Sequence, residues 1–97
     1  MTVALLGVDL LFRSKLSGIV TAAGGVVSRD AEGCDLAVIA IEAPRAMELI
    51  TTLHTRGVPV LAFGPHGRAD LLRAARDAGA VAVPNSQIAE VLEQRLR

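Results

Sequence analysis

Hydrophobic residues in this 97-residue chain fall into short continuous runs separated by stretches of helical spacing. Continuous runs of this length are typical of strands that are covered on both faces of a sheet. We expect five such strands, at residues 2–6, 26–27, 35–41, 58–63 and 81–83. The run at 35–41 is the clearest, and the run at 26–27 is the shortest.

Between the runs, apolar residues recur every three or four positions, which predicts amphipathic helices. A glycine follows each of the first three stretches and is expected to end its helix: Gly24, Gly57 and Gly79. Pro44 is expected in the first turn of the second helix. Asn85 or Ser86 is expected to cap the last helix.

The resulting order is β-α-β-β-α-β-α-β-α, which predicts an α/β fold with an open parallel sheet of about five strands and helices on both faces. Only residues 28–34 separate the second and third strands. A parallel crossover usually takes a dozen or more residues. We therefore expect the second helix to be shortened or missing, and an apolar sheet face to be left uncovered there.

Composition supports one packed domain spanning residues 1–97. Hydrophobic residues make up 52% of the chain, and the only aromatic side chains are Phe12 and Phe63, so we expect an aliphatic core. The single cysteine, Cys34, excludes a disulfide within the chain. It is interpreted as a core residue because no histidine-containing motif that would activate a thiol lies near it.

Charge argues against nucleic acid and anionic membranes as partners. Ten basic and ten acidic side chains give a formal net charge of zero, so there is no electrostatic footprint for a phosphate backbone or a lipid surface. The sequence shows no basic leader, no small-residue cleavage site and no apolar run of membrane-spanning length. We expect a cytoplasmic protein, and the Met1 start favours a whole gene product.

Four segments resemble the receiver domains of bacterial response regulators, which have a flavodoxin-like fold. They are residues 8–13 (VDLLFR), 35–44 (DLAVIAIEAP), 58–63 (VPVLAF) and 74–80 (AARDAGA). They are spread from residue 8 to residue 80, so the resemblance extends over nearly the whole chain, but each segment is a common βα pattern. The resemblance therefore bears on the fold more than on the activity.

The resemblance also implies where receiver chemistry would lie. The phosphate-accepting aspartate lies four residues before a proline in that family, and counting back from Pro44 gives Ala40. The acidic pair that holds Mg²⁺ falls on Gly7 and Val8, and the hydroxyl residue falls on Gly64. The lysine falls near Pro84-Asn85. All four elements are replaced, so the resemblance implies a degenerate receiver that is not an enzyme.

Two groups of polar residues remain as candidates. Gly64, His66, Gly67 and Arg68 precede a helix and are candidates for binding an anion or small ligand. The alternative is that these residues form an ordinary turn.

The carboxylates Asp9 and Glu42 are expected at the same sheet edge, where such a group could act as an acid or a base. Carboxylates that are simply solvated on a loop are more common than carboxylates with this role. Two carboxylates are too few for a tight Mg²⁺ site, so we expect no metal and no cofactor.

These observations favour a phosphorylation-independent pseudo-receiver that acts as a regulatory or protein-interaction module. We expect its partner to be a protein, with a homodimer favoured, because an uncovered apolar face usually marks an association site. The alternative is a small-ligand or anion-binding domain that uses the turn from Gly64 to Asp70.

Overall fold

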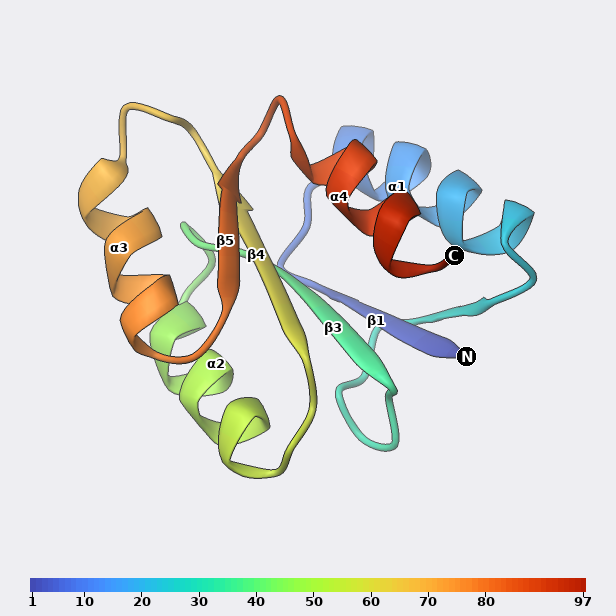
Figure 1. The fold of residues 1–97 in the computed structure, drawn as a ribbon, viewed down its shortest axis with the longest axis horizontal. Helices are drawn as coiled ribbons and strands as arrows, with labels where there is room; N and C mark the ends of the chain where they lie inside the picture. Colours follow the sequence, from blue (N-terminus) through green and yellow to red (C-terminus); the bar gives the residue numbers. More distant parts are fainter.

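The computed structural model describes residues 1–97 and contains five strands and four helices (Figure 1). The strands are β1 (Thr2–Leu6), β2 (Val26–Ser28), β3 (Leu36–Ala40), β4 (Val60–Gly64) and β5 (Val81–Pro84). The helices are α1 (Leu10–Ala22), α2 (Ala46–Thr55), α3 (Ala69–Asp77) and α4 (Ile88–Arg95). The predicted α/β class and strand order along the chain are confirmed. No helix of the fold is long and apolar enough to cross a membrane.

All strand pairs are parallel, and their order across the sheet is β2-β1-β3-β4-β5. In this order β1 lies between β2 and β3, so the chain must cross β1 on its way from β2 to β3. Helices α1 and α4 pack on one face of the sheet and α2 and α3 on the other (Figure 1). This arrangement brings the carboxyl ends of β1, β3 and β4 to the same edge.

Residues on successive strand positions pack into two separate cores, because neighbouring side chains in a strand point to opposite faces. One core includes Ala4, Leu6, Ala37 and Ile39, which face α2 and α3. The other contains their strand neighbours and the buried side of α1 and α4. No polar or charged residue is buried in either core.

The predicted uncovered sheet face is found only at the edge strand β2, where Val26 is 62% exposed, and not over β1. The segment 29–35 that joins β2 to β3 contains no helix, yet Ala4 and Leu6 beneath this side of the sheet are buried. Cys34 belongs to the same core, and Ala31 packs against it. The small alanine side chains of the strands leave room for this short segment to lie directly on the sheet.

The starts of two helices also differ from the prediction. Helix α2 begins at Ala46, after Pro44, because Arg45 adopts a left-handed conformation with φ 60° and interrupts the helix there. The residue that caps α4 is Gln87, and no side chain makes a capping hydrogen bond. Asn85 and Ser86 instead lie in the turn that follows β5, where the Gln87 amide donates to the Pro84 carbonyl at 2.9 Å.

Candidate functional site

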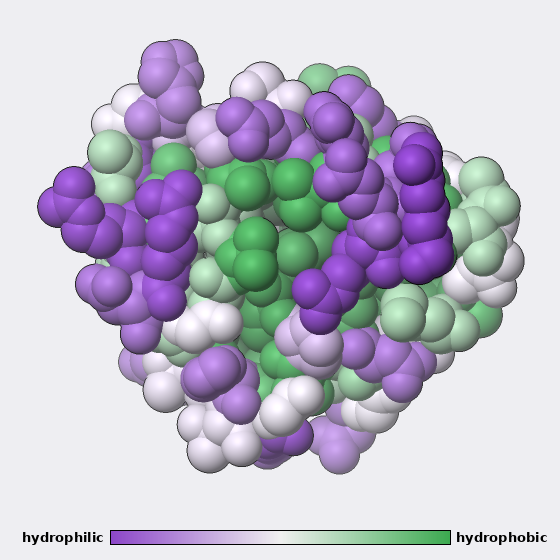
Figure 2. Space-filling model, in the orientation of Figure 1, coloured by the Kyte–Doolittle hydropathy of each residue, from purple (hydrophilic) through white to green (hydrophobic).

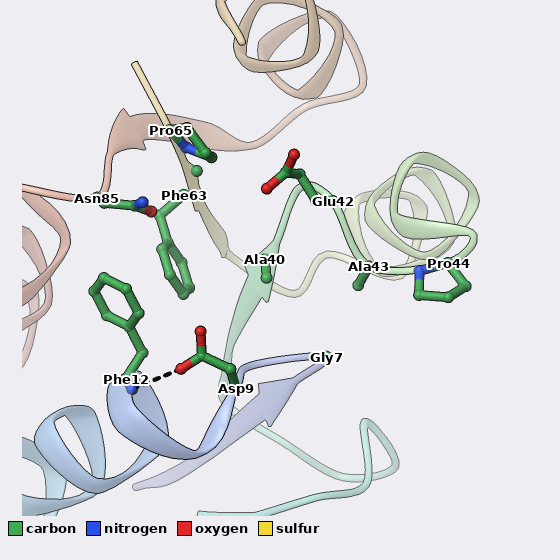
Figure 3. A pocket seen from close by; sticks show the side chains of 11 residues that line it. Gly7, Asp9, Phe12, Ala40, Glu42, Ala43, Pro44, Phe63, Pro65 and Asn85 are labelled. Atoms are coloured by element: carbon green, nitrogen blue, oxygen red, sulfur yellow. Dashed lines mark hydrogen bonds between the residues drawn. The ribbon is translucent and has the colours of Figure 1, made fainter. Parts of the chain in front are cut away.

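A pocket of about 350 Å³ opens at the sheet edge where β1, β3 and β4 end (Figure 3). Its lining comes from the strand ends and from the turns that follow them. The residues are Gly7, Asp9, Phe12, Ala40, Glu42, Ala43, Pro44, Phe63, Gly64, Pro65 and Asn85. We call it the edge pocket. Open parallel sheets commonly bind their ligands at this edge.

Asp9 is held at the edge pocket because it caps α1. Its Oδ1 atom accepts a hydrogen bond from the Phe12 amide at 2.9 Å, which satisfies one of the amides left free at a helix start. The other carboxylate oxygen points into the pocket (Figure 3). The predicted placement of Asp9 at this edge is confirmed, but part of its bonding capacity serves the helix.

Glu42 lies across the edge pocket from Asp9, in the turn after β3 (Figure 3). Arg68, just before α3, approaches its Oε2 atom at 3.4 Å. The same guanidinium contacts the Asp70 carboxylate at 3.3 Å. Neither carboxylate is buried, so solvent screens both ion pairs strongly.

The Arg68 and Asp70 side chains shift each other's protonation equilibria. Their hydrogen bond and opposite charges raise the pKa of Arg68. The hydrogen bond from Arg68 lowers the pKa of the Asp70 carboxyl. Because Arg68 faces two carboxylates, the turn presents no net positive charge to an incoming anion.

Of the four residues proposed for anion binding, only one lines the edge pocket. Gly64 is the last residue of β4 and lines the edge pocket. His66 and Gly67 are exposed and do not line it. Arg68 does not line it either, but its guanidinium contacts Glu42, which does, and Asp70.

The two phenyl rings of the edge pocket come from residues that the sequence did not single out as site residues. Phe12 and Phe63 lie with ring centroids 5.1 Å apart and planes tilted by 52°. Ala40, at the end of β3, places only a methyl group in the pocket (Figure 3). The signal for Phe63 was its place near the carboxyl end of a predicted strand, but its contact with Phe12 spans more than fifty positions.

Two glycines of the edge pocket leave no space for a side chain. A Cβ atom built on Gly7 would lie 2.4 Å from the Ala43 Cβ, and Gly7 also has a φ of +66°. A Cβ atom on Gly64 would lie 2.3 Å from the Ile41 side chain. Such distances do not occur between real side chains, so larger residues at either position require their neighbours to move.

The ionisable lining consists of Asp9 and Glu42 alone, with no lysine or arginine. Nowhere in the chain do three or more His, Cys, Asp or Glu side chains gather closely enough to hold a metal ion. The pocket also contains no serine, threonine, cysteine or histidine. What the lining offers chemically is two acceptor carboxylates, the Asn85 amide and two phenyl rings.

No protein-family model matches the chain, and no curated protein matches its sequence. Solved structures do match, and receiver domains and response regulators are among them. A putative response regulator from Chloroflexus aurantiacus superposes with a TM-score of 0.81 at 18% identity, covering 98% of this chain and 93% of that one. A response regulator receiver protein from Pseudoalteromonas atlantica gives 0.77 at 16% identity, covering 99% and 96%.

A CheY-like receiver domain protein from Methanospirillum hungatei gives a TM-score of 0.76 at 16% identity, covering 98% of this chain and 92% of that one. In each of these three matches the shared architecture extends over almost the whole of both chains. At such low identity the likeness shows the fold. The chain therefore has the five-stranded receiver-like architecture that its sequence pattern predicts.

Proposed function

We propose that this chain is a receiver-like regulatory domain that accepts no phosphoryl group and acts by binding proteins. The observation that carries the proposal is Ala40, which lies at the end of β3 inside the edge pocket. If the resemblance to receivers holds position by position, the acceptor carboxylate of that family would lie there. A methyl group has no lone pair with which to attack phosphorus.

The carboxylates near Ala40 do not replace the missing acceptor. Glu42 is exposed and paired with Arg68, and Asp9 accepts the capping bond from Phe12. Phosphoryl transfer also relies on a bound Mg²⁺ and on positive charge around the transferred group. The lining has neither three metal ligands nor a basic side chain.

The packing around the edge pocket leaves no space for the receiver side chains that this chain lacks. The resemblance assigns one Mg²⁺ ligand to Gly7 and the hydroxyl residue to Gly64. A side chain at Gly7 would collide with Ala43, and one at Gly64 with Ile41. Neighbouring side chains thus occupy the space that these groups would need, which favours a role independent of phosphorylation.

A protein-binding role is supported by the exposed edge of the sheet. Figure 2 shows an apolar area over β5, bordered by polar side chains of α3 on one side and of α4 on the other. Val81 is 49% exposed in this area, and Val83 is partly exposed. Apolar areas rimmed by polar residues commonly mark protein association sites.

The proposal is tested by incubating the protein with acetyl phosphate and Mg²⁺ and measuring its intact mass. A phosphorylatable receiver domain treated in parallel serves as the positive control. We expect no added phosphoryl group on the wild-type chain. We expect none on the Ala40→Asp variant either, because the other Mg²⁺ ligands remain absent. An acyl phosphate on the wild-type chain would overturn the proposal.

Anion binding at the turn before α3 is separated from this proposal by a thermal-shift experiment with inorganic phosphate and nucleotides. We expect no stabilisation, because Glu42 and Asp70 already neutralise Arg68. A stabilisation that disappears in both His66→Ala and Arg68→Ala would favour a ligand-binding function instead.

A further inference from the structure

A second hollow, of about 450 Å³, lies between α1 and α4 and shares no lining residue with the edge pocket. We call it the helix groove. The two helices lie side by side on one face of the sheet (Figure 1). Its lining consists of small and apolar residues with charged residues among them: Lys15, Gly18, Ile19, Ala22, Ala23, Glu93, Leu96 and Arg97.

The helix groove is open because α1 presents small residues beside it. A Cβ atom built on Gly18 would meet no atom within 4 Å. Ala22, one turn further along α1, adds only a methyl group and is exposed. Ile19 and Leu96 are partly buried at the groove and supply apolar surface.

A projecting apolar side chain lies on the same side of α1 as the helix groove. Leu11 is 81% exposed. The positions of Leu11, Lys15, Gly18 and Ala22 are separated by four, three and four residues, which places them on one stripe of the helix. One surface therefore carries both an exposed leucine and a hollow lined by small side chains.

We propose that a second copy of this chain docks on this surface, with its Leu11 side chain entering the helix groove. The proposal rests on the proposed protein-binding function and names one partner for it. A two-fold interface uses the same patch on both copies, so the patch must carry both the projection and the hollow. Leu11 and Ala22 are about 16 Å apart along the axis of one α1 helix. When two α1 helices pack antiparallel, Leu11 of each copy would lie near Ala22 of the other.

The helix groove carries charges of both signs, which a second copy can complement. Lys15 and Glu93 both line it, and Glu93 contacts Arg97 at 3.4 Å. The antiparallel two-fold packing brings Lys15 of one copy level with Gly18 of the other, on the side where Glu93 lies. Opposite charges then face each other twice across the interface.

The first test is the solution mass of the protein by light scattering over a concentration series. We expect a dimer for the wild-type chain. Leu11→Asp should raise the dimer dissociation constant about tenfold or more, because it places an unpaired charge where an apolar side chain is buried. The matched control is Leu10→Asp, since Leu10 is 82% exposed but points to a different side of α1, and it should dimerise as the wild type does.

A second variant blocks the helix groove without endangering the fold. Gly18→Gln adds a long side chain where nothing is in contact, and it replaces a glycine inside a helix by a better helix former. We expect it to weaken dimerisation about tenfold or more while the melting temperature of the monomer does not fall. An unchanged dimer would contradict the assignment of the groove.

Charge reversal tests the orientation of the two copies. Lys15→Glu and Glu93→Lys should each weaken the dimer, because each places like charges opposite one another. The double variant should recover most of the loss. If the double variant is weaker than both single variants, the two-fold packing is wrong.

The outcomes also separate this inference from the proposed function. A wild-type monomer at every concentration would overturn the groove interface, while leaving the acetyl phosphate result and binding to other proteins as tests of the function. A dimer that resists Leu11→Asp but is lost in Val81→Asp would place the contact over β5. That outcome would overturn only the groove.

Discussion

The two faces of the sheet are covered in different ways. On the face of α1 and α4, the strands present large side chains: Val3, Leu5, Leu36, Val38, Leu61 and Phe63. On the face of α2 and α3, alanine recurs on four strands: Ala4, Ala37, Ala62 and Ala82. The first face is covered by two helices, and the second by two helices together with the short segment from β2 to β3.

The small side chains on the second face explain how only seven residues can connect β2 to β3 across β1. A crossover between parallel strands usually takes a dozen or more residues when it contains a helix, and seven residues are too few to build one. Alanines leave space for the backbone of residues 29–35 to approach the strands, and Cys34 fills part of that space. The Asp35 carboxylate then accepts from the Thr2 amide at 2.7 Å and fixes the end of the segment.

The largest expected effects come from exchanging side-chain size between the faces within β3. Leu36→Ala should lower the free energy of unfolding by about 2 to 5 kcal/mol, because it leaves a cavity against α1 and α4. Ala37→Leu should lower it by about 1 to 3 kcal/mol through overpacking on the opposite face. Both residues are buried, and urea unfolding followed by circular dichroism measures the changes. If Ala37→Leu leaves the free energy of unfolding unchanged, the crossover segment moves away from the sheet at little cost.

The crossover segment itself is tested at Cys34. Desolvation by burial raises the pKa of its thiol, with the nearby Asp35 and Asp30 charges adding to the effect. The thiolate is the reactive form, so we expect slow alkylation by iodoacetamide at neutral pH and faster reaction in urea. Cys34→Ser should lower the free energy of unfolding by about 1 to 3 kcal/mol, because it buries a hydroxyl group.

The sign of the pH dependence at Cys34 follows from its raised pKa. The protonated thiol contributes stability that is complete below the pKa of the unfolded chain, and this is lost as the pH rises through the higher folded pKa. Stability of the wild type should therefore fall more steeply on the alkaline side than that of Cys34→Ala. Equal slopes would mean that the segment leaves the thiol in contact with water.

On each face, one arginine of a helix donates a hydrogen bond to a strand carbonyl. Removing either arginine should change the free energy of unfolding less than the core substitutions do. Arg76 in α3 donates to the Ala82 carbonyl at 2.8 Å, and Arg13 in α1 donates to the Leu5 carbonyl at 3.0 Å. Removing either side chain with alanine should cost about 1 to 2 kcal/mol in urea unfolding. Arg76→Lys is the control that keeps the charge. A much smaller loss at Arg13 would mean that the larger side chains beneath α1 hold it in place unaided.

The sequence was sufficient for the elements because continuous apolar runs and helical stripes are local signals. The edge location of Asp9 and Glu42 also followed from local reasoning, since both come directly after strands. Local reasoning did not find the pairing of Glu42 with Arg68, because the two residues are 26 positions apart. It also did not predict that Cys34 covers part of the sheet, because a short loop has no hydrophobic periodicity from which its packing could be inferred.

The smallest expected effect lies at the start of α3, whose cap differs from that of α1. Asp9 caps α1 with a side-chain hydrogen bond, whereas Arg68 at the start of α3 makes none and instead holds Asp70. Because the hydrogen bond from Arg68 lowers the pKa of Asp70, its contribution to stability is present above the unfolded pKa and is lost as the pH falls through the folded one.

A carboxyl titration by NMR should therefore place the Asp70 midpoint below the usual aspartate range. Arg68→Ala should return it to that range, and Glu42→Gln, which removes the other carboxylate facing Arg68, should leave it low. Salt should shrink the shift, because both groups are exposed and ions screen their attraction. A midpoint that is low even in Arg68→Ala would mean that the dipole and amides at the start of α3, rather than the arginine, stabilise the carboxylate.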